Sequence, residues 1–103
     1  MGKNSVIKTL GKRIGNVVLH KLLIKYTHRP ESINHLQKEE VTYRDAAIKD
    51  AREYNWNEGD KQTMKIQAIR FIKDKKVNKY SDVDLPSDEI EKLVEEEIVA
   101  LRL

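Results

Sequence analysis

Three histidines are the residues of this chain best suited to hold a metal ion, and they lie within a short stretch of sequence. His20 and His28 are separated by about two helical turns, which is too far for both to bind one ion. His35 and Glu39 are four residues apart and would share one side of a helix, but no third ligand stands nearby. The histidines are therefore interpreted as surface residues, and neither a metal site nor a cofactor is predicted.

Other kinds of active site lack their characteristic residues. The absence of cysteine excludes disulfides and Cys-ligated zinc, and no serine stands in a nucleophile-elbow motif. Asp82 and Asp84 begin like a calcium-binding loop, but Pro86 and Ser87 occupy the fifth position and the position that requires glycine. No glycine-rich phosphate loop or dinucleotide loop occurs. We therefore predict no catalytic residues and expect a protein that is not an enzyme.

The 37 charged residues follow the chain in blocks that nearly cancel, since 20 Lys and Arg oppose 17 Asp and Glu. Residues 1–30 carry a net charge of +7, residues 31–60 carry −4, residues 61–80 carry +6 and residues 81–103 carry −6. Extended blocks of this kind would repel within themselves, whereas a folded chain brings opposite signs together. The pattern predicts that oppositely charged helices face one another within the fold.

Length and composition predict one folded domain over residues 1–103. A chain of 103 residues is too short for two separate cores. Disorder requires low hydrophobicity with high net charge, but 39% of the residues are hydrophobic and the net charge is only +3. No apolar run has the length of a signal peptide or of a membrane span. We therefore expect a cytoplasmic protein that does not enter a membrane.

Apolar residues recur at helical spacing and predict an all-α fold. We expect a small helical bundle with main helices at about 5–28, 43–55, 61–76 and 88–101 and a short helix near 31–39. The helix over 61–76 has apolar residues on more than one side, which predicts that it lies at the centre of the bundle.

Polar residues at the ends of these segments predict where helices begin. Thr42 with Asp45 three residues later resembles a capping box, which predicts a helix start after Thr42. Asp60 and Ser87 are predicted to cap the two helices that follow them.

Two glycines in the first helix predict a close contact with another helix. Gly11 and Gly15 are four residues apart and share one helix face with Val18 and Leu22. A pair of small residues at this spacing lets a second helix approach closely. This helix belongs either to the same domain or to a second copy in a dimer.

Three charged side chains project into otherwise apolar helix faces. Glu97 interrupts the apolar stripe of the last helix, and Lys21 and Lys25 interrupt that of the first. An unpaired charge is costly to bury, so such residues usually pair with one another or lie at the core edge. We predict that the first and last helices pack together, with Glu97 within about 8 Å of Lys21 or Lys25.

Nucleic-acid binding is the alternative function that the sequence offers. Two predicted helices separated by the turn at 55–60 resemble a helix-turn-helix in outline, and the second of them is basic. The candidate phosphate contacts are Lys61, Lys65, Arg70, Lys73 and Lys76. The turn is long for this motif, and the bases are spread around the helix.

No motif in the sequence is distinctive of a protein family. The small-residue helix face and the lack of catalytic groups favour a non-enzymatic domain that binds a protein partner or forms a homodimer. DNA or RNA binding through the basic helix remains the alternative.

Overall fold

The computed structural model describes residues 2–26, 29–81 and 85–101, and within these ranges the chain is helical without strands. The elements are α1 (Lys3–Tyr26), the 3₁₀ turn η1 (Pro30–Ser32), α2 (Ile33–Ala51), α3 (Glu58–Asn78) and α4 (Ser87–Ala100). The prediction of an all-α bundle is confirmed. Residues 27–28 at the end of the predicted first helix lie outside the described residues.

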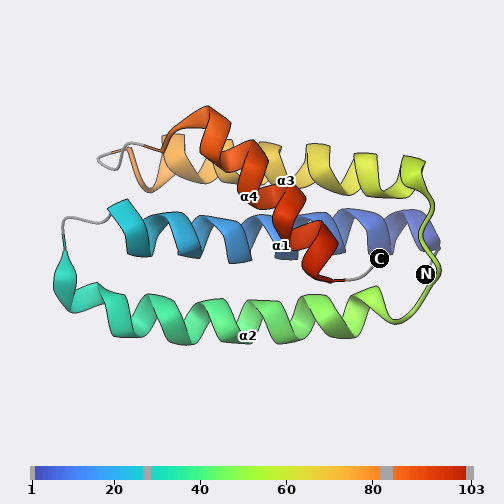
Figure 1. Cartoon of the computed structure of the whole chain (residues 1–103), viewed down its shortest axis with the longest axis horizontal. Coiled ribbons are helices and arrows are strands. Elements are labelled where there is room, and N and C mark those ends of the chain that lie inside the picture. Colours follow the sequence, from blue (N-terminus) through green and yellow to red (C-terminus); the bar gives the residue numbers. More distant parts are fainter. Residues whose placement is uncertain (1, 27–28, 82–84, 102–103) are drawn as a thin grey trace.

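The first helix, α1, is the centre of the bundle, not α3 as the sequence predicted. In Figure 1, α2 and α3 lie on opposite sides of α1, and α4 crosses α1 and α3 on one face. The helix α1 contacts all three others, whereas α3 contacts only α1 and α4 among the described helices. One side of α3 therefore stays free of any described helix.

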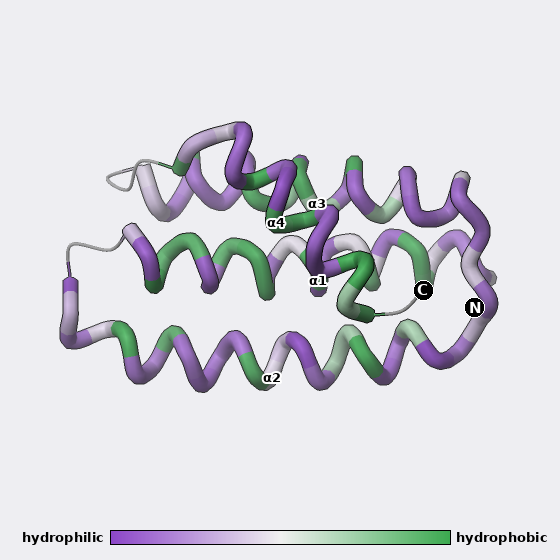
Figure 2. Tube along the Cα trace, in the orientation of Figure 1, coloured by the Kyte–Doolittle hydropathy of each residue, from purple (hydrophilic) through white to green (hydrophobic). Residues whose placement is uncertain are grey.

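The core consists mainly of α1 and of the helix sides that face it. Figure 2 shows that hydrophobic residues dominate the second half of α1. This half is apolar on most sides because α1 packs against three other helices. The largest fully buried side chains are those of Leu10, Ile14, Val17, Val18, Leu19, Leu22, Met64, Ile72, Ile90 and Val94. Because the 24 residues of α1 pack against three helices, a modest number of apolar residues suffices to build one continuous core.

The predicted break before residue 43 is wrong, because α2 is one continuous helix. Thr42 lies inside it, and its hydroxyl donates to the carbonyl oxygen of Lys38 at 3.1 Å instead of capping a helix start. No glycine or proline stands between residues 33 and 51, so nothing in the backbone ends the helix there. A threonine followed by an acid is a capping box only where the chain bends.

Two predicted helix caps also differ in the structure. Asn57 caps α3, and it exchanges hydrogen bonds with Asp60: Asn57 Oδ1 accepts from the Asp60 amide at 2.8 Å, and Asp60 Oδ2 accepts from the Asn57 amide at 3.1 Å. Asp60 is thus the third helical residue, and α3 begins earlier than predicted. Pro86 occupies the N-cap position of α4, and Ser87 is the first helical residue.

Candidate interaction surface

The glycine face of α1 lies directly against α3. A Cβ atom added to Gly11 would lie 2.7 Å from Gln67 Cβ, and one added to Gly15 would lie 2.9 Å from the carbonyl oxygen of Ala68. Val18 and Leu22, on the same face, are fully buried. Because α3 of the same chain covers this face, a second copy has no access to it.

The three charged residues of the predicted ion pair lie along the contact between α1 and α4. Lys21 Nζ lies 3.9 Å from Glu97 Oε2, whereas Lys25 Nζ pairs with Glu89 Oε1 at 2.5 Å. Glu97 is only 2% exposed, and its Oε1 accepts from Arg44 Nε at 3.0 Å and from Arg44 Nη2 at 2.9 Å. Sequence reasoning missed Arg44, although its place three residues before the buried Ala47 put it at the edge of the inner face of α2.

The five basic residues proposed for phosphate contacts differ in whether they pair with acids. Lys61 lies 3.4 Å from Glu58, and Lys65 pairs with Glu95 and lies 3.8 Å from Glu91. The other three, Arg70, Lys73 and Lys76, form no salt bridge to an acid in the described part of the chain.

The two helices of the proposed helix-turn-helix do not contact one another. In that motif the helices pack together across a short turn. Here α2 and α3 lie on opposite sides of α1 (Figure 1), and the resemblance ends with their order in the sequence.

The free side of α3 carries both apolar and basic side chains. We define the outer α3 face as Ile66, Ile69, Arg70, Lys73 and Val77, which recur at helical spacing. Ile66 is 52% exposed and Val77 is 73% exposed, and a shallow hollow of about 370 Å³ lies between Ile66 and Lys73, bordered by Asp74. This face therefore places two exposed apolar side chains next to the cations of Arg70 and Lys73.

One of the three histidines, His20 on α1, is buried. His20 is 3% exposed, so its interpretation as a surface residue is wrong. Its Nδ1 lies 2.7 Å from the carbonyl oxygen of Asn16, and its Nε2 lies 2.6 Å from Glu39 Oε2. Each ring nitrogen of His20 therefore faces an oxygen that accepts hydrogen bonds.

Glu39 joins this buried histidine to an exposed one. Its second oxygen, Oε1, lies 2.7 Å from Nε2 of His35, one turn earlier on α2. No group of three or more His, Asp or Glu side chains in the described residues is arranged to hold a metal ion. His28, Asp82 and Asp84 lie outside those residues.

The pairing of Glu39 makes a defined contribution to the pH dependence of stability. The hydrogen bond from His20, together with the charges of His20, His35 and Lys79, lowers the pKa of Glu39 below its ordinary value near 4.5. A carboxyl whose pKa is lowered by folding stabilises the fold above its unfolded pKa, and this contribution is lost as the pH falls through the folded pKa.

We expect Glu39→Gln to lower the free energy of unfolding at neutral pH by less than about 1 kcal/mol, because a third of the side chain is exposed. Urea unfolding of wild type and variant should show a difference that disappears as the pH falls through the folded pKa of Glu39, which lies below 4.5. A difference that persists unchanged in acid would contradict the assigned pairing.

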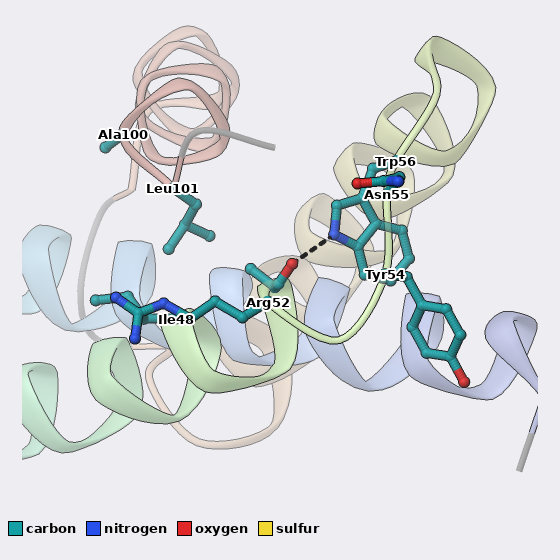
Figure 3. A pocket seen from close by; sticks show the side chains of 8 residues that line it. Ile48, Arg52, Tyr54, Asn55, Trp56, Ala100 and Leu101 are labelled. Carbon is teal, nitrogen blue, oxygen red and sulfur yellow. Dashed lines mark hydrogen bonds between the residues drawn. The ribbon is translucent and has the colours of Figure 1, made fainter.

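A hollow lies between the end of α2, the α2–α3 connection and the end of α4, and Figure 3 shows its side chains. It measures about 630 Å³ and is lined by Ile48, Ala51, Arg52, Tyr54, Asn55, Trp56, Ala100 and Leu101. Trp56 Nε1 donates to the carbonyl oxygen of Ala51 at 2.9 Å, which holds the α2–α3 connection against α2. Among the residues that the structure describes, the lining of this hollow includes no carboxylate and no imidazole.

Comparison of the chain with models of protein families, with curated proteins and with solved structures finds no match. Among the helices that the structure describes, none combines the length and apolar character needed to cross a membrane.

Proposed function

We propose that this domain is a non-enzymatic protein-interaction module whose outer α3 face binds an acidic amphipathic helix of another protein. The observation that carries the proposal is the exposure of Ile66 and Val77 next to Arg70 and Lys73. An apolar stripe with cations at its edges complements a helix that carries leucine-like residues on one side and carboxylates beside them.

The mixture of side chains favours a protein over a nucleic acid. Phosphate groups gain nothing from Ile66 and Val77, which lie among the bases, and Asp74 at the edge repels them. Two bases of the original candidate set, Lys61 and Lys65, are already paired with acids.

Charge also favours a different protein over a second copy of this chain. A two-fold pairing of outer α3 faces would place the Arg70 and Lys73 cations of both copies in one contact, opposed by only one nearby acid, Asp74, per copy. Burying like charges together opposes association.

We expect Ile66→Glu to weaken binding of a designed acidic amphipathic peptide by about tenfold or more, because it replaces an exposed apolar side chain of the contact with a carboxylate that repels the acidic peptide. Fluorescence anisotropy of the labelled peptide gives the affinity, with Val99→Glu on α4 as the matched control, since Val99 is 75% exposed but lies elsewhere.

Two further measurements with the same proteins test nucleic-acid binding and self-association as alternative functions. Tighter binding of duplex DNA than of the peptide, with a steep salt dependence, would replace the proposed function with nucleic-acid binding. A dimer in sedimentation that Ile66→Glu abolishes would replace it with self-association. Equal peptide affinity of wild type and Ile66→Glu would refute the surface assignment.

A further inference from the structure

A polar hollow lies between α1, α2 and α3, away from the outer α3 face. It measures about 240 Å³, and we call it the three-helix hollow. Its lining residues are Asn16, Leu19 and His20 from α1, Glu39 and Tyr43 from α2, and Phe71, Lys75, Lys79 and Tyr80 from α3 and its end. Most of these side chains carry hydrogen-bond donors.

Two lysines on one wall form no salt bridge with a described acid, although the charge of Lys79 acts on Glu39. Lys75 and Lys79 are one helical turn apart and form no salt bridge within the described residues. Instead, Lys75 Nζ lies 5.6 Å from the centre of the Phe71 ring, and Lys79 Nζ lies 5.6 Å from the centre of the Tyr80 ring. The aromatic rings hold both ammonium groups beside the hollow while leaving their protons free to bind an anion.

Two phenol groups add neutral donors. The hydroxyls of Tyr43 and Tyr80, which both line the hollow, form no hydrogen bond within the described ranges 2–26, 29–81 and 85–101. The Tyr43 ring lies 5.1 Å from the buried His20 ring, centre to centre.

Glu39 is the one acid among the described residues that line the hollow, and it is already engaged. Glu39 accepts from His20 at one oxygen and contacts His35 Nε2 at the other. Its single negative charge is opposed by the two ammonium groups of Lys75 and Lys79, so the described lining residues carry excess positive charge.

We propose that the three-helix hollow binds a small phosphate-bearing ligand through Lys75 and Lys79, with Tyr43 and Tyr80 as hydroxyl donors. A phosphate group has three terminal oxygens and matches two ammonium groups plus two hydroxyls better than a carboxylate with two oxygens does. The site is independent of the proposed function, since no residue of the outer α3 face lines it.

The test is an NMR titration of the whole chain with inorganic phosphate, in which chloride keeps the ionic strength constant. We expect saturable shifts of backbone amides around Asn16, Tyr43 and Tyr80. In Lys75→Met/Lys79→Met these shifts should require about tenfold more phosphate or be lost, because two charge-assisted contacts are removed.

The matched control is Arg70→Met/Lys73→Met, which removes the same number of cations from the other side of α3. This control should bind phosphate like wild type and lose affinity for the acidic peptide. The Lys75→Met/Lys79→Met variant should bind the peptide like wild type and lose affinity for phosphate. The two proposals therefore fail separately.

A second arm identifies the source of the phosphate group. Phosphatidylcholine vesicles with and without phosphatidic acid, tested by co-sedimentation, distinguish a lipid headgroup from a free phosphate ligand. Tyr43→Phe/Tyr80→Phe keeps both rings and should weaken phosphate binding. Unsaturable shifts in wild type, or shifts of equal size in the lysine variant, would overturn the proposal.

Discussion

Replacing Gly15 with leucine is expected to lower the free energy of unfolding by about 3 kcal/mol, because the new side chain has no room between α1 and α3. A Cβ alone would lie 2.9 Å from the Ala68 carbonyl oxygen and 3.0 Å from Phe71 Cδ1, and the first of these is backbone that moves only with α3. Removing a glycine from a helix restores up to about 1 kcal/mol of helix propensity, which offsets only part of the loss.

Urea unfolding monitored by circular dichroism measures this change. Gly2→Leu is the matched control, since no atom lies within 4 Å of a Cβ placed at Gly2. It should leave the unfolding midpoint nearly unchanged. A Gly15→Leu protein as stable as wild type would show that α1 and α3 are not packed as closely as the structure has them.

The glycine contact shows what a local sequence pattern can predict about helix packing. The spacing of Gly11 and Gly15 predicted close helix packing, because small residues one turn apart leave a groove whatever covers it. The identity of the covering helix depends on the order of the helices in space. Nothing in the sequence of α1 distinguishes α3 from α4, or from a second copy, as the neighbour.

The helix boundaries were predictable where the backbone itself supplies the signal. The turn at 55–60 combines asparagine, glycine and aspartate, and a helix begins there, although the capping residue is Asn57. Thr42 and Asp45 carried the same side-chain signal without a bend, and they lie inside α2. Capping side chains therefore predict a helix start only together with residues that interrupt the helix.

Contacts between distant polar residues were the least predictable feature. His20 and Glu39 meet across α1 and α2 because of the register in which those helices pack, and their spacing in the sequence carries no trace of it. For Glu97 the pattern indicated that a partner was needed, since a charge stood in an apolar stripe. Its closest partner, Arg44, lies on α2, although α4 packs against α1 and α3 and not against α2.

The outer α3 face was visible in the sequence but was interpreted differently. Ile66 and Ile69 lie off the main apolar stripe of their helix, and a second apolar side predicted a helix buried all round. In the structure α1 takes the central place, and Ile66 is exposed. A helix with two apolar sides is either enclosed or has one side left over for binding, and only the arrangement of its neighbours decides between them.

Arg44→Met should cost more stability than Glu97→Leu, although the two residues form the same ion pair. Removal of Arg44 leaves the carboxylate of Glu97, only 2% exposed, with Lys21 at 3.9 Å as its remaining cation. We expect the free energy of unfolding to fall by about 2–3 kcal/mol, since a buried charge then lacks its closest partner.

Removal of Glu97 leaves no such buried charge. Arg44 keeps its contact with Glu40 at 3.1 Å, and its side chain is 36% exposed, so water solvates the guanidinium. Leucine at position 97 extends the apolar stripe of Ile90 and Val94 on α4. We therefore expect Glu97→Leu to change the free energy of unfolding by less than about 1 kcal/mol in either direction.

The double variant Arg44→Met/Glu97→Leu distinguishes a lost ion pair from lost packing. It should recover most of the stability that Arg44→Met loses, because the unpaired carboxylate is gone. Glu40→Gln measures the separate contribution of the Arg44–Glu40 contact, for which we expect less than about 0.5 kcal/mol. If the double variant is as unstable as Arg44→Met, the cost lies in the packing of the arginine side chain on α2, and the ion pair with Glu97 contributes little to the fold.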